Sequence, residues 1–414
     1  MKSLSAKVLI LLSLFCLLLT SCNGGGGMSA GGGIDGTGIM SAGVVSAFGS
    51  IVVNGTEFDT SKAPVIINGK QVGVGDDVVR SNLEIGMVVR VEGRIKEDGS
   101  AVADRVIYSS SVFGPVENVG SVDPITNEKE IIVLGQTVVV NSITEFRPDT
   151  YGFDEIAPND VVEVSGYRDF DGKIRATYIE EITDPNISVY EVTGFVKSLD
   201  DPTPNTFLIN GLTIDYSLIH PDDLPDNFNN ELFVEVEGEL DDTSGDLVAA
   251  KIALADELDG ENGDEIEIIG FVTEIISENG IIKFKIGNQE VHADIDAEIV
   301  VYVDGLPGDI ALGQKLEAEG RFEGGILIAW EIEFWKPDQI EVEGVVDQVD
   351  YILDFPEFTF EERDDQLFQT NNETEFADIE RGDIEAGMKL EVKGVPVDIN
   401  HDVVVADKVS FELK

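Results

Sequence analysis

A short apolar segment that carries a glycine recurs five times along this chain of 414 residues. The glycines are Gly43, Gly114, Gly194, Gly270 and Gly344, at spacings of 71 to 80 residues. Self-similarity at a nearly fixed period constrains the fold more than composition does, because every unit must adopt the same small structure. The chain is therefore expected to contain five diverged copies of one domain.

Each unit also contains a second strand that runs up to a glycine. These glycines, about fifty residues after the first ones, are Gly93, Gly166, Gly238, Gly320 and Gly394. The residues four and two positions before each glycine are apolar, and the residues between them and the glycine are polar or charged. Strict alternation predicts a strand with one face on a core and the other face in water.

Three further landmarks complete the unit. A large apolar residue stands ten positions before each second glycine, and we expect it to plug the barrel: Leu83, Ile156, Phe228, Ile310 and Ile384. An Ala-x-x-apolar motif follows at Ala103, Ala176, Ala249, Ala329 and Ala406. The dipeptides Asp98-Gly99 and Asp171-Gly172 predict hairpin turns.

We count roughly five strands in each unit of about 70–75 residues and no long helix. Five short strands with one buried face close most naturally into a barrel, because closure removes the exposed sheet edges. The predicted fold is all-β, a tandem array of five small OB-like β-barrel domains after a signal peptide and a Gly-rich tether. An open meander packed on its neighbour is the alternative.

The landmarks predict the following domain boundaries. The ranges are 1–21 for a lipoprotein signal peptide, 22–38 for a lipidated Cys and Gly-rich tether, 39–111 and 112–184 for repeats 1 and 2, 188–255 for a divergent repeat 3, 256–265 for an acidic linker, and 266–336 and 339–414 for repeats 4 and 5.

The first residues have the order of an export signal. Lys2 and Lys7 precede an apolar run over 8–19, which is shorter than the about 20 residues that a membrane-spanning helix needs. Leu19-Thr20-Ser21-Cys22 resembles the lipobox of bacterial lipoproteins, in which the cysteine is lipidated. This resemblance implies a lipid anchor at Cys22 and a cell-envelope location. Asn23, in place of the Asp that favours inner-membrane retention, implies the outer membrane, on its periplasmic face or at the cell surface.

Composition excludes several classes of function. The chain has 81 acidic and 27 basic residues, a net charge of −54, so nucleic acid is not an expected partner. Hydrophobic residues make up 43% of the chain, which is too many for a disordered protein. Cys16 and Cys22 are the two cysteines, so removal of the signal and lipidation would leave no thiol for a disulfide, a nucleophile or a metal.

The repeat landmarks resemble a bacterial lipoprotein family known only as a domain of unknown function, DUF5666. The matching segments are 48–55 and 85–93, followed by Asp98-Gly99 and Ala103, and the likeness is clearest in repeats 1 and 2. The resemblance implies a repeated domain in an exported protein and implies no activity.

Sites for chemistry are few. Calcium is the one cofactor that the sequence suggests, with Asp256, Asp259, Glu261 and Asp264 of the acidic linker as candidate ligands; a solvated linker is the simpler interpretation. Asp169-Phe170-Asp171-Gly172 is interpreted as a structural turn. His220, His292 and His401 occupy no shared position in the repeats, and no catalytic residue is predicted.

The sequence therefore favours a non-enzymatic, lipid-anchored envelope protein in which the barrels act as a scaffold or a binding module. A polysaccharide or an envelope protein is the expected partner. A calcium-responsive adhesin-like protein and a polysaccharide-binding surface protein are alternatives. An unrecognised hydrolase is a remote one, because the members of a catalytic triad lie far apart in sequence.

Overall fold

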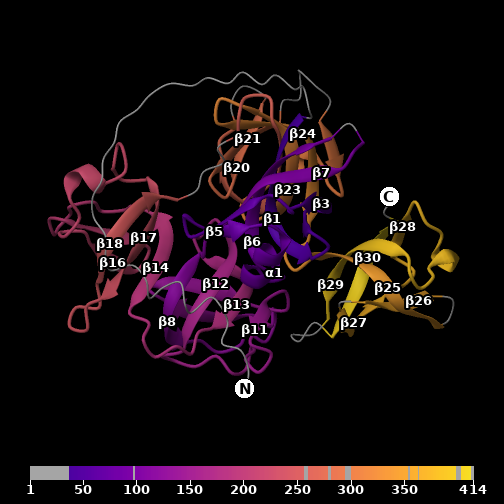
Figure 1. The fold of residues 1–414 in the computed structure, drawn as a ribbon, viewed down its shortest axis with the longest axis horizontal. Helices are drawn as coiled ribbons and strands as arrows, with labels where there is room; N and C mark the ends of the chain where they lie inside the picture. The colour runs from indigo at the N-terminus through magenta and orange to yellow at the C-terminus, as the bar shows by residue number, and fades with distance from the viewer. Residues whose placement is uncertain are drawn as a thin grey trace.

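The structure is a computed structural model that describes residues 37–96, 98–255, 260–277, 281–293, 300–352, 355–361, 363–397 and 402–411. It consists of five small β-barrels, barrels 1 to 5 in chain order, that pack against one another (Figure 1). The predicted fold class is confirmed.

Barrel 1 contains β1 (Thr37–Ala47), β2 (Ile51–Val53), β3 (Thr56–Asp59), β4 (Pro64–Ile67), β5 (Lys70–Val74), α1 (Asp76–Asn82), β6 (Val88–Ile95) and β7 (Ala101–Tyr108). Barrel 2 contains β8 (Val112–Val119), β9 (Lys129–Val133), β10 (Gln136–Val140), β11 (Glu145–Arg147), β12 (Val161–Arg168) and β13 (Ile174–Glu181). Barrel 3 contains β14 (Val189–Phe195), β15 (Thr206–Ile209), β16 (Leu212–Asp215), the 3-10 turn η3 (Pro221–Asp223), β17 (Phe233–Leu240) and β18 (Leu247–Leu254).

Barrel 4 contains β19 (Glu265–Ile275), β20 (Ile282–Ile286), β21 (Gln289–Ala293), β22 (Val301–Val303), η4 (Pro307–Asp309), β23 (Lys315–Glu323) and β24 (Ile326–Trp335). Barrel 5 contains β25 (Ile340–Ile352), β26 (Phe355–Phe360), β27 (Arg363–Gln369), β28 (Glu375–Ala377), η5 (Arg381–Asp383), β29 (Lys389–Pro396) and β30 (Val403–Phe411).

All five barrels close in the same way. In barrel 1, β1 pairs with β2 and β6, β2 with β3, and β6 with β7, all antiparallel. The circle is closed by the parallel pair β3–β7. The parallel pairs β10–β13, β16–β18, β21–β24 and β27–β30 repeat this closure in the other barrels. This topology of five strands with one parallel closing pair is that of an OB-like barrel, so the open meander is not observed.

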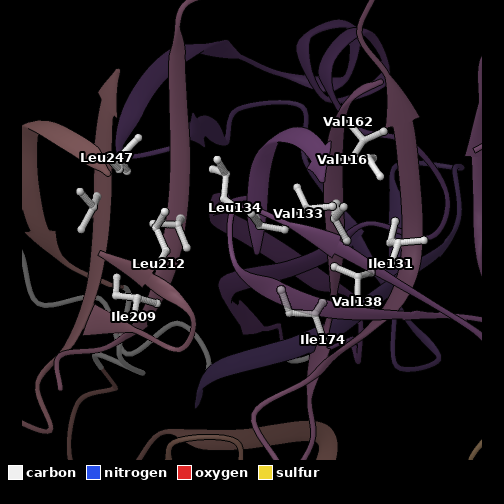
Figure 2. Packing of buried hydrophobic residues seen from close by; sticks show 14 of the residues in the cluster. Val116, Ile131, Val133, Leu134, Val138, Val162, Ile174, Ile209, Leu212 and Leu247 are labelled. Atoms are coloured by element: carbon white, nitrogen blue, oxygen red, sulfur yellow. The ribbon is translucent and has the colours of Figure 1, made fainter. Parts of the chain in front are cut away.

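The inward positions form the cores, as the alternation predicts. Val89 and Val91 of β6, and the corresponding Val162 and Val164 of β12, are fully buried. The predicted plugs also lie in or against the cores, with Leu83, Ile156 and Ile384 buried and Phe228 and Ile310 packed at the edge. One apolar cluster runs from barrel 2 into barrel 3 without interruption; Figure 2 shows Ile131, Val138, Leu134, Leu212 and Leu247 along it.

The second glycine does not end its strand, as the sequence had suggested, but lies inside it. In every barrel the register with the last strand shifts at this residue, as at Glu319/Gly320, which marks a β-bulge. The backbone of the partner strand approaches very closely here. A Cβ on Gly320 would stand 2.2 Å from the carbonyl oxygen of Ile328, so only glycine fits this bulge.

The barrels do not pair in chain order. The first strand of barrel 1 runs parallel to the first strand of barrel 4, with Ile39 opposite Glu265 and Ala42 opposite Ile268, so that the two barrels share one sheet. The first strands of barrels 2 and 3, β8 and β14, pair antiparallel. Barrel 5 forms a separate sheet, but β25 lies against β1. The chain therefore folds back on itself instead of extending as a string.

This packing corrects the expectation that the polar strand faces lie in water. Arg90, Ser165, Glu235 and Lys393 occupy outward positions on the second strands and are all buried. They are buried because the outer face of one barrel packs against another barrel. The polar side chains that the alternation placed in solvent thus make up much of the contact surface between repeats.

Candidate functional site

The largest group of buried charges lies where barrels 1, 4 and 5 meet. The ammonium group of Lys393, on β29, lies 2.8 Å from Glu333 Oε2 and 3.3 Å from Glu341 Oε2. It also lies 4.6 Å from the centre of the Trp335 ring, whose indole N–H donates to Glu317 Oε2 at 3.0 Å. The carboxylates and the aromatic ring thus replace the water that the buried ammonium group has lost.

Barrel 1 contributes two polar side chains and a hairpin turn to the same place. Ser41 Oγ on β1 donates to Glu267 Oε2 at 3.1 Å, and Asn54 Nδ2 donates to Ser41 Oγ at 3.0 Å. Gly55, in the β2–β3 turn, lies against Glu391, since a Cβ there would be 3.1 Å from Glu391 Oε2. We refer to Glu267, Glu317, Glu333, Trp335, Glu341, Glu391 and Lys393 as the junction cluster.

Carboxylates outnumber cations in the junction cluster, and three of these buried carboxylates have raised pKa values. Burial raises the pKa of Glu317 to about 7, with partial compensation by Lys393. Burial together with Glu341 raises the pKa of Glu391 to about 7, and burial also raises the pKa of Glu267 well above its usual value. Burial alone would lower the pKa of Lys393, but the surrounding carboxylates outweigh it and raise that pKa.

A groove of about 290 Å³ opens next to this cluster, between barrels 1 and 5. Its barrel 1 wall is formed by the β1–β2 loop with Phe48, by Val52 and Glu57 on β2 and β3, and by Arg80 of α1. Its barrel 5 wall is formed by residues of β25, β26, β27 and β29. The walls are joined by Lys389, whose ammonium group lies 3.0 Å from Glu57 Oε2. We call this depression the groove.

Arginine side chains shape the groove from both sides. Arg80 donates to the carbonyl oxygens of Phe48 and Gly49, at 3.2 and 2.8 Å, and so fixes the β1–β2 loop. Arg363 of β27 donates to the carbonyl oxygen of Ser46 at 3.4 Å and to Gln366 Oε1 at 2.9 Å. The groove is therefore bordered by fixed guanidinium groups although the protein as a whole is strongly acidic.

A smaller cavity of about 60 Å³ lies behind the groove and shares Ser46, Ile85 and Arg363 with it. Barrels 1, 2, 4 and 5 all contribute to its lining, among them Tyr167 of barrel 2 and Lys315 of barrel 4. Burial lowers the pKa of Lys315 to about 8, because Asp338, Glu341 and Glu317 compensate only in part. A cavity of this volume has room for a small number of water molecules, which could bond to Lys315 and Arg363 within an otherwise mostly apolar lining.

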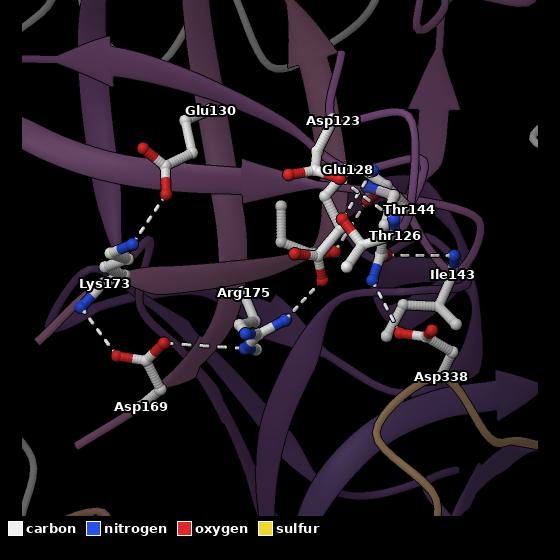
Figure 3. A network of polar contacts seen from close by, with 12 residues as sticks. Asp123, Thr126, Glu128, Glu130, Ile143, Thr144, Asp169, Lys173, Arg175 and Asp338 are labelled. Atoms are coloured by element: carbon white, nitrogen blue, oxygen red, sulfur yellow. Dashed lines mark hydrogen bonds and ion pairs between the residues drawn. The ribbon is translucent and has the colours of Figure 1, made fainter. Parts of the chain in front are cut away.

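The segment between barrels 4 and 5 is fixed on barrel 2. Asn141 Nδ2 donates to Asp338 Oδ1 at 2.7 Å, and burial, with the charge of Glu128, raises the pKa of Asp338 (Figure 3). Beside it, Arg175 forms ion pairs with Glu128 at 2.7 Å and Asp169 at 3.5 Å. The polar sequence Lys336-Pro337-Asp338 therefore does not act as a loose connection, since it docks on a neighbouring barrel.

The turn at Asp169 has the structural role that was predicted for it. Asp169 Oδ1 accepts the backbone N–H groups of Asp171 and Lys173, each at 3.0 Å, and Gly172 has a φ of 78°. This is an Asx-type turn that connects β12 and β13.

The predicted calcium ligands are only partly within the described structure. Asp256 and Asp259 lie outside the described residues, as does Cys22. Asp264 Oδ2 accepts the backbone N–H of Glu261 at 2.8 Å, and its other carboxylate oxygen lies against Gly38 at the start of β1. In the described part of the chain, no group of three or more acidic, histidine or cysteine side chains is arranged to hold a metal ion.

Neither of the two histidines that the structure describes lines the groove. His220 precedes η3 in barrel 3, and His292 on β21 of barrel 4 pairs with Glu290, so neither lines the groove or the cavity behind it. His401 lies outside the described residues. Among the helices that the structure describes, none has the length and the apolar character needed to cross a membrane.

Sequence reasoning did not identify the groove or the junction cluster. One signal was present: the residue before the second glycine is Glu92, Ser165, Glu237 and Glu319 in the first four repeats, but Lys393 in the fifth. A cation at a position that is otherwise mostly acidic indicates a special environment. It could not reveal which carboxylates surround it, because most of them come from another repeat: Glu317 and Glu333 belong to barrel 4 and Glu341 to barrel 5.

Fold and site together define a protein built from repeated OB-like barrels that are locked together by buried ion pairs. The family model described as "Domain of unknown function (DUF5666)" matches residues 37–107, 114–180, 193–253 and 343–410. The chain belongs to this family. Barrel 4 lies outside the matched segments but has the same topology.

Other comparisons add little. No curated protein is similar enough to this chain to count as a match. Among solved structures, one described as "drosophila Unr CSD456" is 17% identical, covers 55% of this chain and 98% of its own length, and has a TM-score of 0.13. A TM-score this low supports no conclusion about shared fold or function.

Proposed function

We propose that this protein is a non-enzymatic envelope lipoprotein, anchored through Cys22, whose packed barrels hold a polysaccharide segment in the groove. The observation that carries the proposal is the position of the groove on the β1–β2 loop and the β2–β3 surface of barrel 1. OB-like barrels bind oligosaccharides and oligonucleotides at this surface and its loops. The net charge of −54 disfavours a nucleic acid, so a polysaccharide is the better candidate.

The chemistry of the groove supports this choice by analogy with the fold. Phe48 offers a half-buried aromatic face, and Arg80, Glu57 and Glu361 supply donors and acceptors for hydroxyl groups. The volume of about 290 Å³ is close to the lower end of the range for small-molecule pockets, about 300–1,000 Å³. Barrel 5 forms the second wall, so binding requires the packed arrangement and a single barrel would not suffice.

Binding can be tested with a soluble chito-oligosaccharide and with an uncharged soluble glucan as probes, by isothermal titration calorimetry. We expect the wild-type chain to bind one of them and Phe48→Ala to weaken binding by about tenfold, because an aromatic contact in a partly desolvated groove is lost. Ile125→Ala, at an exposed apolar residue of barrel 2, is the control and should bind normally. Failure of both probes to bind, or equal binding by the two variants, would contradict the proposal.

Anchoring is tested independently by fractionation of the cells that produce the protein. Cys22→Ala should move the protein from the membrane fraction to the soluble fraction, because it removes the attachment point of the acyl chains. Several acyl chains on one residue bind a bilayer much more firmly than a single chain does. Cys16→Ala, at the other cysteine, should leave the protein with the membrane. If the Cys22→Ala protein stayed with the membrane, lipid attachment at this residue would be wrong.

A further inference from the structure

One outward position on each barrel is equivalent in all five repeats. The residue after the leading glycine lies directly opposite the first residue of the second long strand. The pairs are Val44–Val88, Pro115–Val161, Phe195–Phe233, Phe271–Lys315 and Val345–Lys389. Their neighbours in sequence, such as Val45 and Val196, point into the barrel cores, so the pairs themselves point outward. We call them the outer pairs.

In barrels 1 and 4 the outer pair is covered by another barrel. Phe271 of barrel 4 is only 2% exposed, because it packs with Tyr167 of barrel 2 and lies 5.5 Å below the guanidinium group of Arg175. Val44 and Val88 of barrel 1 pack against the same cluster.

In barrel 5, the outer pair Val345–Lys389 lines the groove opposite barrel 1. Lys389 also binds Glu57 of barrel 1. The same surface thus serves repeatedly for barrel-to-barrel contact.

Barrel 3 has the most apolar outer pair and leaves it exposed. The rings of Phe195 and Phe233 lie 4.9 Å apart, and Phe195 is 38% exposed, in contrast to 2% for the equivalent Phe271. At the rim, Lys197 lies 5.9 Å from the centre of the Phe195 ring and 2.5 Å from Glu231. An exposed aromatic ring next to a half-buried one, with a charged rim, has the composition of an interface centre.

We propose that the outer pair of barrel 3 is the contact through which two copies of this chain associate. Each covered outer pair named above is covered by another barrel of the same repeat, so the partner that fits this surface is again such a barrel. The chain already brings equivalent positions together, since Val112 of barrel 2 and Val192 of barrel 3 are equivalent and lie opposite each other.

A second copy extends this arrangement by placing barrel 3 against barrel 3 around a two-fold axis. Such a contact is self-complementary.

The charges at the rim agree with a two-fold contact. Lys197 and Glu231 form an exposed pair, so they can exchange partners across the axis without leaving a charge unpaired. An apolar centre is also needed here, because two chains of net charge −54 repel each other over most of their surfaces. The association is therefore expected to strengthen with salt, which screens that repulsion.

The test is sedimentation of the chain from Asn23 onward, which retains every described residue, over a hundredfold range of concentration. We expect a concentration-dependent dimer, and Phe195→Asp should weaken it at least thirtyfold, because it places a charge at the centre of the contact. Leu218→Asp, at a residue of the same barrel that is 77% exposed, is the matched control and should dimerise normally. A wild-type chain that stays monomeric, or a Phe195→Asp chain that still dimerises, would overturn the proposal.

A second variant tests the geometry. The chain from Asn23 onward has no cysteine, so Phe195→Cys introduces a single thiol. If the two-fold axis passes through the outer pair of barrel 3, mild oxidation should join two copies by a disulfide in high yield. Leu218→Cys should not cross-link under the same conditions. Equal yields from the two variants would show that the copies meet elsewhere or only by collision.

Discussion

Replacing Lys393 with methionine should destabilise the contact of barrel 5 with barrels 1 and 4 by about 3–5 kcal/mol. Methionine keeps the approximate length of the side chain but removes the ammonium group that Glu333 and Glu341 contact at 2.8 and 3.3 Å. The carboxylates would then be buried without compensation, and this is much more costly than the loss of an exposed ion pair. The loss should be visible as earlier unfolding of barrel 5 in urea, followed by amide hydrogen exchange.

The matched control is Lys336→Met. Lys336 also contacts barrel 5, through Asp407 at 2.6 Å, but its side chain is 60% exposed. Water screens such a pair, so the free energy of unfolding should change by less than about 1 kcal/mol. If the two variants were equally stable, Lys393 would not hold the junction together. Glu333→Gln in the Lys393→Met background should recover part of the stability, because it removes one of the uncompensated charges.

Stability should increase as the solution is acidified from pH 8 to about 5.5. Glu317 and Glu391 have pKa values of about 7 in the folded protein, against an ordinary value of 4.5, so the folded state binds their protons more tightly. The resulting stabilisation is fully present below pH 4.5 and is lost as the pH rises through 7. Each carboxyl should contribute on the order of 2 kcal/mol over this window.

Other groups do not reverse this trend within the window. Lys315, whose pKa burial lowers to about 8, opposes the trend only near pH 8; about one pH unit lower it is protonated in both the folded and the unfolded chain, and its contribution is then constant. Asp98 and Asp241 have lowered pKa values, and the stability that they contribute is lost only below their ordinary value of 3.8. Glu191 and Glu235, on the paired strands β14 and β17 of barrel 3, act in the same direction, because burial raises the pKa of both.

The measurement is urea unfolding at several pH values, followed by the tryptophan fluorescence of β24, which carries Trp330 as well as Trp335 of the junction cluster. The double variant Glu317→Gln with Glu391→Gln should flatten the pH dependence, because amides do not titrate. Glu323→Gln, at an exposed carboxylate paired with Arg321, should leave it unchanged. General charge repulsion also decreases on acidification, but salt screens it, whereas the buried carboxyls are screened much less. A pH dependence that disappears in high salt would contradict the role of the junction cluster.

The barrel itself was predictable from sequence because its information is local. Alternation before Gly93 and its four equivalents identified the residues that enter each core, and the plug residues such as Leu83 were recognised from their constant distance to that glycine. The role of the glycine was only half recognised. Its recurrence was evident in the sequence. The bulge, however, depends on how closely the last strand approaches the glycine, as Ile328 approaches Gly320, and this distance cannot be predicted from the sequence of a single strand.

The groove and the junction cluster were not predictable for a different reason. Alternation along a strand predicts which side chains face the core of their own barrel, but it does not predict what covers the opposite face. Glu267, Glu341 and Lys393 look like ordinary solvent-exposed residues in the sequence. Their burial results from the pairing of β1 with β19 and from the packing of β25 against β1, and both contacts join segments more than 200 residues apart.

Five repeats, the all-β class and the acidic character of this protein could therefore be predicted from the sequence, which favoured a closed barrel over an open meander. These follow from periodicity and composition, which act within one unit of about 70–75 residues. The tertiary structure alone decided which barrels touch, and with that the location of the groove and the raised pKa values of the buried carboxyls. The physical reason is that desolvation depends on every surface that surrounds a side chain, and here those surfaces come from repeats that are not neighbours in the chain.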